Sequence, residues 1–316
     1  MEAIVDIVLP VFCLIAIGYL VAKFKFLDEA AGDGLANYVI KVAVPVLLVR
    51  SIATAQYNDV NPWAFIAVYF IAVLVTWFGG TILLGLIFKR GYRTSVIAGV
   101  SAAFSNLVLL GIPIVERAYG APGLQILFFL IAFHLPIMMS MSTVLMEHAV
   151  RADGVEERPL QLLTVGRSLF RNLAKNPIII GIFIGIMWRF SGFGVGGLAG
   201  QVMDLLARTT GPLALFSLGM GLIKYGIKGN LLPAIGLVGL SLIVMPATVL
   251  LVAQYLLPLP PLWLKVAVLL AACPTGMNAY LFATYFKIAE GLATNTIVLS
   301  LVGSVVTIPI WLSITN

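Results

Sequence analysis

The chain has 316 residues, of which 61% are hydrophobic and only 10% are charged, and its mean hydropathy is +1.09. Soluble domains carry about 25% charged residues, so the composition excludes a soluble globular protein and indicates an integral membrane protein. The apolar runs are too long for the roughly ten-residue strands of a membrane barrel, so an all-α fold is predicted. The net charge of +6 fits basic cytoplasmic loops and, without a basic patch, does not indicate nucleic-acid binding.

A window of about 20 residues predicts ten transmembrane helices. The first apolar run has no basic segment before it, so it is interpreted as a span and not as a cleavable signal. The predicted spans cover residues 3–22, 34–54, 63–88, 94–117, 123–147, 177–190, 199–223, 231–256, 262–285 and 290–314. Thirteen Lys and Arg residues then fall on one side of the membrane and three on the other. By the positive-inside rule both termini are expected to face outward.

A polar central segment divides the chain into two halves of five spans each. The first repeat is expected at 1–150, a cytoplasmic linker at 151–175 and the second repeat at 176–316, together forming one transport domain. Apolar periodicity suggests a short amphipathic helix near residues 160–172 of the linker, and a plain linker is the alternative. Because five is odd, the two halves have opposite orientations, which is the arrangement of a 5+5 inverted repeat.

Spans four and nine are interrupted at corresponding positions. Span four contains Asn106 and Pro113, and span nine contains Pro274 and Asn278, with the two Asn residues 172 positions apart. Paired interruptions indicate a transporter's binding site, although each taken alone is typical of an ordinary kink. Helices that begin near Pro113 or Asn278 would offer N-terminal N–H groups, and two such ends supply about one positive charge, enough for one carboxylate. The amides of Asn106 and Asn278 and the hydroxyl of Thr275 can add donors without a formal charge.

Span two supplies further candidate binding residues. Pro45 lies four positions after Lys41, and span seven repeats this spacing. Pro45 is either part of the site or a plain kink, and Val46 and Leu215 are expected to line the cavity around it. Lys41 either extends its amine to the inner surface or attracts an anion toward the site.

Other polar groups in the spans have simpler interpretations. Asp204 precedes Arg208 by four residues, a spacing that predicts a helical ion pair. His134 is either a proton relay or, more commonly for such a residue, hydrogen-bonded to a neighbouring helix. Gly181 and Gly185 form a GxxxG pattern typical of close helix packing. The sequence has no metal-ligand spacing and no nucleophile motif, so no catalytic residue, metal or cofactor is expected, and the chain is predicted not to be an enzyme.

These segments resemble the auxin efflux carrier family. The match rests on the Asn-x-x-x-x-Gly-Ile-Pro run ending at Pro113, on "CPTGMNAYLFATYF" of span nine and on "VVTIPIW" of span ten. The resemblance implies a fold similar to that of bile acid/sodium symporters, with helices four and nine crossing at their prolines and binding the carboxylate. It also implies a homodimer. The long central loop of many plant members is missing, which favours a bacterial plasma (inner) membrane protein and a substrate other than auxin.

The membrane potential favours a direction of transport. An inside-negative potential of about 100 mV drives a monoanion outward with about 2.3 kcal/mol, whereas uptake of a dianion opposes about twice that energy. Facilitated export or exchange of organic acid anions is therefore expected. H⁺- or Na⁺-coupled dicarboxylate uptake is the first alternative, and an anion channel is the alternative from another class.

Overall fold

The computed structural model describes residues 2–55, 61–154, 166–167, 170–171, 173–224, 229 and 231–315. These residues fold into helices, and the extended structure among them is limited to one isolated bridge, so the all-α prediction is confirmed. The amphipathic helix expected near 160–172 falls mostly outside the described residues.

Among the described residues, seven helical stretches are long and apolar enough to cross a membrane, which makes the chain a multi-pass membrane protein. They are Ile4–Lys23, Glu29–Thr54, Pro62–Ile87, Leu107–Ala152, Gly197–Lys224, Leu232–Tyr255 and Glu290–Thr315. Two further apolar helices, Pro177–Ser191 and Pro261–Ala271, are shorter. Helical residues occur in each of the predicted spans. The number of crossings stays a prediction, because spans four and nine are divided, and spans four and five meet at a non-helical backbone at Gly120.

The contacts divide the chain into two compact units, and each takes segments from both predicted halves. Unit 1 comprises Met1–Val60, Val108–Ala132 and Phe170–Lys224. Unit 2 comprises Asn61–Leu107, Phe133–Leu169 and Tyr225–Asn316. The helix α6 (Ile112–Ala152) has residues in both units, with a non-helical backbone at Gly120. A compact unit is not the same thing as a sequence repeat, so the repeat boundaries remain a prediction.

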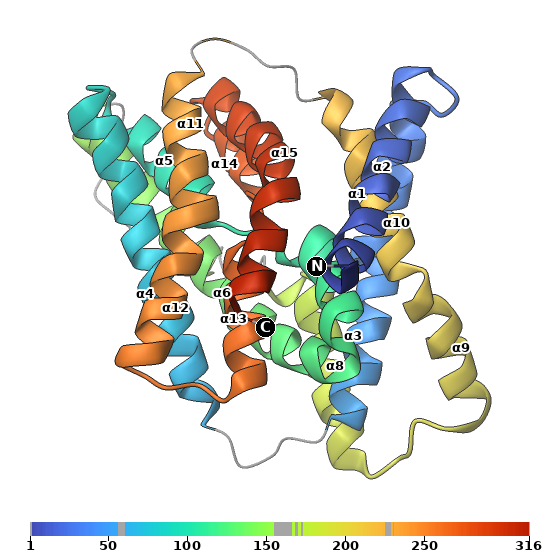
Figure 1. Ribbon diagram of the computed structural model, residues 1–316. Coiled ribbons are helices and arrows are strands. Elements are labelled where there is room, and N and C mark those ends of the chain that lie inside the picture. The colour runs from blue at the N-terminus through green and yellow to red at the C-terminus, as the bar shows by residue number, and fades with distance from the viewer. Residues whose placement is uncertain are drawn as a thin grey trace. The chain divides into compact units, whose positions relative to one another are not determined.

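In unit 1 the chain forms two closely packed helix pairs. Its other elements are α1 (Glu2–Lys23), α2 (Glu29–Tyr38), η1 (Val39–Ala43), α3 (Val44–Thr54), α8 (Pro177–Ser191), α9 (Gly197–Arg208), α10 (Thr210–Gly221) and η4 (Leu222–Lys224). Helix α10 packs on α1 and α2, which lie side by side with it in Figure 1, while α3 packs on α8 and α9. Glycines permit these contacts: a Cβ on Gly18 of α1 would overlap the backbone of Phe216, and one on Gly219 of α10 would overlap that of Ile15.

The α8–α3 pair uses the predicted GxxxG face. A Cβ on Gly181 would lie 2.8 Å from the Cα of Pro45, and one on Gly185 would lie 3.1 Å from the Cα of Val49. The interpretation of these two glycines as a close packing face is therefore confirmed.

Unit 2 is built around α4 and α15. Its elements are α4 (Pro62–Ile82), η2 (Leu83–Ile87), α5 (Tyr92–Ala103), α11 (Leu232–Gly239), η5 (Leu240–Val244), α12 (Met245–Tyr255), α13 (Pro261–Ala271), α14 (Asn278–Tyr285) and α15 (Glu290–Thr315). Helix α4 packs on α5, α12 and α13, and α15 contacts α5, α11, α13 and α14. The large side chains of Phe65, Tyr69 and Trp77 on α4 are fully buried in this unit. Figure 1 shows α11 continuing into α12 as one ribbon.

Three of the helical prolines follow π-helical turns. The segments η1, η3 (Leu107–Gly111) and η5 each end two residues before a proline, namely Pro45, Pro113 and Pro246. A proline has no N–H and its ring clashes with the carbonyl four residues earlier, so a wider turn relieves the contact. In unit 2 the carbonyl four residues before Pro246 belongs to Leu242, and it accepts a hydrogen bond of 2.9 Å from Nε1 of Trp311. The π-helical turn before Pro246 thus has a specific hydrogen-bond partner.

Candidate functional site

The first interruption lies at the end of α5. This helix ends at Ala103, and a helical backbone resumes at Leu107 with η3. Helix α6 begins at Ile112, so Pro113 is in its first turn, as expected. The non-helical segment, however, covers Phe104 to Asn106 and precedes Pro113. The π-helical turn of η3 accommodates the proline, which has no N–H to donate.

The second interruption separates α13 from α14. Helix α13 ends at Ala271 and α14 begins at Asn278, which confirms the predicted start of a half-helix at this residue. Pro274 and Thr275 lie in the non-helical segment between them. Both interruptions belong to unit 2.

The two interruptions pair with each other through their backbones. Ser105 and Thr275 form an antiparallel bridge. The N–H of Asn106 donates to the carbonyl of Pro274 at 2.8 Å, and the N–H of Gly276 donates to the carbonyl of Phe104 at 2.7 Å. An interrupted membrane helix exposes backbone groups that lipid cannot satisfy. Here each break supplies the hydrogen-bond partners that the other one lacks.

Small side chains extend this pairing into the neighbouring helices. The hydroxyl of Thr275 donates to the carbonyl of Ser101 near the end of α5 at 2.7 Å, and the N–H of Thr275 donates to Oγ of Ser300 in α15 at 3.0 Å. Oγ of Ser105 donates to Sδ of Met245 at 3.7 Å. The sequence reasoning missed the three serines, although small polar residues within apolar spans were a signal that could have identified them.

The predicted donors differ in how accessible they are. Asn106 is 7% exposed and Thr275 is 2% exposed, whereas Asn278 is half-buried. The hydroxyl of Thr275 already donates to the carbonyl of Ser101, and Asn278, at the start of α14, is the most exposed of these three residues. The binding roles of Asn106, Pro274, Thr275 and Asn278 stay predictions, while their common location at the paired breaks is now defined.

His134 is enclosed by aromatic rings beside the first break. Its ring meets those of Phe104 and Tyr69 edge to face, with centroid distances of 5.0 and 5.7 Å, and that of Phe70 at 6.4 Å. The residue is buried, and within the described part of the chain its Nε2 makes no hydrogen bond. The expected hydrogen bond to a neighbouring helix is therefore not made by this nitrogen. His134 instead packs against Phe104, the residue that opens the interruption.

The other predicted site residues belong to unit 1. Lys41 is exposed within η1, and Pro45 and Val46 are half-buried in the first turn of α3. Leu215 is 2% exposed and so is a packed residue of α10. Pro113 lies near α10, where a Cβ on Gly211 would be 3.9 Å from the Cβ of the proline. The cavity-lining roles proposed for these residues are untested.

The predicted ion pair between Asp204 and Arg208 is wrong, because Asp204 pairs with a different arginine. Asp204 of α9 pairs with Nε of Arg50 of α3, and Arg208 is exposed. The contact between α3 and α9 brings Arg50 to the carboxylate, which a spacing rule within one helix cannot reveal. No group of three or more His, Cys, Asp or Glu side chains that could hold a metal ion occurs in the described residues.

Comparison with known proteins identifies the family. A family model described as "Membrane transport protein" matches residues 3–312. The "Putative malonate transporter" of Rhizobium meliloti is 25% identical over 98% of this chain and 94% of its own length. An "Uncharacterized transporter" of Methanothermobacter thermautotrophicus is 26% identical over 97% of this chain and 96% of its own length. "Auxin efflux carrier component 8" of Arabidopsis thaliana is 22% identical over 90% of each chain. The family and these relatives are transporters and not enzymes, and the chain belongs to the auxin efflux carrier family of membrane transport proteins.

Proposed function

We propose that this protein is a secondary transporter that moves small organic acid anions across the plasma membrane by alternating access. The observation that carries the proposal is the pairing of two interrupted helices through Ser105 and Thr275 in unit 2. Irregular backbone at membrane depth is tolerated where it is buried in protein or lines a watery cavity, and transporters use such breaks as binding sites.

The chemistry of the break favours an anion. Helix α14 directs its N-terminus to the interruption, and a helix N-terminus carries about half a positive charge together with N–H groups. Asn278 in the first turn adds an amide donor that is partly accessible. A carboxylate fits these donors, and none of the residues between Phe104 and Asn106 or between Ala272 and Asn278 carries a charge that would repel it. The binding roles of Lys41, Pro45, Val46, Pro113 and Leu215, which belong to unit 1, are a separate proposal.

The packing supports the fold that this mechanism requires. In a ten-span inverted repeat, span one corresponds to span six and span two to span seven. The contact of α1 with α10 then corresponds to that of α8 with α3, and both contacts depend on glycines. We propose ten crossings, crossover helices at the two breaks, both termini outside and a homodimer. Cysteine accessibility at each terminus and the mass of the detergent-purified particle test the last two points.

The direction of transport has two candidates. For a monoanion, an inside-negative potential of about 100 mV contributes about 2.3 kcal/mol to export, so efflux or exchange needs no coupling ion. The name of the Rhizobium meliloti relative favours a second candidate, coupled uptake of a dicarboxylate such as malonate. Uptake that depends on a proton or sodium gradient distinguishes this candidate from the first one.

Exchange in proteoliposomes tests the proposed function. Labelled malonate and labelled monocarboxylates are loaded, and efflux is compared with and without unlabelled acid outside. A carrier shows acceleration by substrate on the far side, whereas an anion channel shows flux without acceleration. Asn278→Ala is expected to lower exchange at least tenfold, and Asn37→Ala on the exposed face of α2 is the matched control. Equal exchange by both variants would remove Asn278 from the site, and the absence of flux for all acids would reject the proposal.

A further inference from the structure

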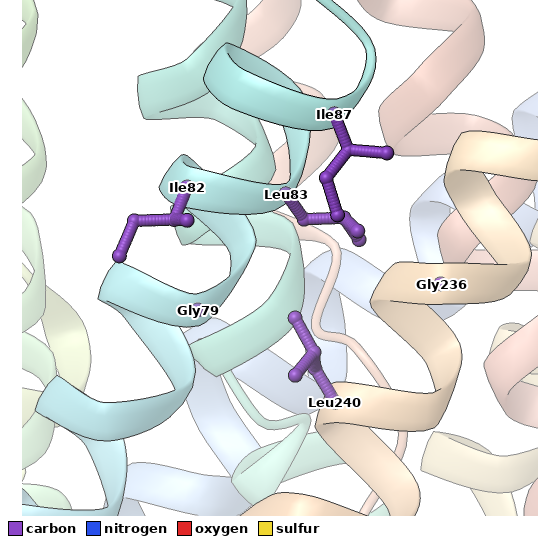
Figure 2. Close-up of a pocket in the computed structure, with 6 residues that line it drawn as sticks. All are labelled: Gly79, Ile82, Leu83, Ile87, Gly236 and Leu240. Carbon is purple, nitrogen blue, oxygen red and sulfur yellow. The ribbon is translucent and has the colours of Figure 1, made fainter.

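Unit 2 carries an apolar groove between α4 and α11. The groove has a volume of about 210 Å³ and is lined by Gly79, Ile82, Leu83, Ile87, Gly236 and Leu240. Figure 2 shows Ile82, Leu83 and Ile87 on the wall formed by α4 and η2, and Leu240 on the opposite wall with Gly236 one turn away. None of the lining residues has a polar side chain.

The two glycines let leucine side chains of the opposite wall pack closely against the helix backbone. A Cβ on Gly236 would lie 2.7 Å from Cδ2 of Leu83, and a Cβ on Gly79 would lie 3.3 Å from Cδ2 of Leu240. Behind the groove, a buried cluster formed by Leu84, Ala98, Ala102 and Leu237 makes a solid floor, against which Leu83 and Leu240 also pack. The groove is therefore a fixed feature of the packing between the two helices.

The rim of the groove faces the hydrocarbon of the bilayer. Ile82 is 53% exposed and Ile87 is 67% exposed, and both lie on a helix long and apolar enough to span a membrane. A polar solute would lose its hydrogen bonds to water in such a groove without replacing them. A hydrocarbon chain would lose nothing and would gain van der Waals contacts with both walls. The fitting occupant is therefore an acyl chain.

One end of the groove is basic. After Ile87 the chain turns back on itself: the N–H of Phe88 donates to the carbonyl of Leu83 at 3.2 Å, and the N–H of Arg90 donates to that of Leu84 at 2.9 Å. Lys89, with a φ of 51°, makes the turn possible. This hydrogen bonding holds the exposed residues Lys89 and Arg90 beside the turn that contributes Leu83 to the groove.

Asp153, an acidic residue near this basic end, accepts hydrogen bonds from the backbone. The carboxylate of Asp153 accepts hydrogen bonds from the backbone N–H groups of Tyr92 and Arg93, each at 3.3 Å, at the start of α5. Among the described residues Lys89 and Arg90 form no ion pair, so their charges are available to an anion at the membrane surface. A phosphate group is the anion that a membrane places at the end of an acyl chain.

We propose that this groove binds one acyl chain of an anionic phospholipid, with the headgroup phosphate at Lys89 and Arg90. The site lies entirely in unit 2 and does not depend on the proposed transport function. It would attach this unit to the leaflet on the basic side of the membrane. Each basic residue near an anionic surface contributes about 1 kcal/mol, which corresponds to about a fivefold change in lipid affinity.

Native mass spectrometry of the purified protein tests the proposal. The full chain is delipidated, incubated with an equimolar mixture of phosphatidylglycerol and phosphatidylcholine, and the ratio of bound lipids is measured. We expect wild-type protein to prefer phosphatidylglycerol, and Lys89→Gln with Arg90→Gln to lower the preference by about 25-fold. Lys25→Gln is the matched control, because Lys25 lies in the turn after α1 in the same left-handed conformation as Lys89.

A second pair of variants tests the hydrocarbon part. Gly236→Leu fills the groove and is expected to reduce retention of both lipids, whereas Gly239→Leu, where a Cβ meets nothing within 4 Å, is expected to leave it unchanged. If Gly236→Leu does not fold, the double variant at the basic end still decides the question. Equal retention of the two lipids by wild type, or an unchanged preference in the double variant, would overturn the proposal.

Discussion

The hydroxyl of Thr275 offers a direct test of how the two interrupted helices are stabilised. Replacing it by valine, Thr275→Val, keeps the shape of the side chain and removes the hydrogen bond to the carbonyl of Ser101. Thr275 is 2% exposed, and no water can replace the lost donor without rearrangement. A buried acceptor left without its partner costs about 1–3 kcal/mol.

This cost is measurable as a shift in thermal unfolding. With about 2–4 °C for each kcal/mol, Thr275→Val is expected to lower the melting temperature in detergent by about 2–12 °C, as measured by tryptophan fluorescence. Thr275→Ser keeps the hydroxyl and loses one methyl group. Its free energy of unfolding should therefore fall by only about 0.8 kcal/mol, and its melting temperature by about 2–3 °C. A melting temperature for Thr275→Val equal to or above that of Thr275→Ser would refute the hydrogen-bonding explanation of the paired breaks.

Two further predictions concern the packing of each unit. Gly18→Ala would force the α1 backbone away from that of Phe216, so it should destabilise the protein by about 1–3 kcal/mol in the same unfolding assay. Gly221→Ala, where a Cβ meets no neighbour, should be neutral or stabilising, and equal effects of both would argue against close backbone contact. Trp311→Phe leaves the carbonyl of Leu242 before Pro246 without its donor. We expect the free energy of unfolding to fall by about 1–3 kcal/mol, whereas wild-type stability would mean that this carbonyl needs no partner.

The sequence determined the class of the protein, the helical nature of its spans and its family. Those features depend on local composition and short motifs. The backbone of an apolar run in lipid can satisfy its hydrogen bonds within the run only as a helix, and the run from Asn106 to Pro113 resembles the family. The sequence also located both helix interruptions, with the second half-helix starting at Asn278 as expected. The GxxxG face of Gly181 and Gly185 followed from spacing alone, since three residues between two glycines place both on one side of a helix.

Only the tertiary structure decided which groups satisfy one another. The bridge between Ser105 and Thr275 joins residues 170 positions apart, and the choice of Arg50 over Arg208 by Asp204 depends on the contact between α3 and α9. The first break lies before Pro113 because a π-helical turn accommodates the proline within the helix that follows the break. Hydrogen bonds and ion pairs of this kind depend on distances between helices that are remote in sequence, and spacing rules describe neighbours within a single helix.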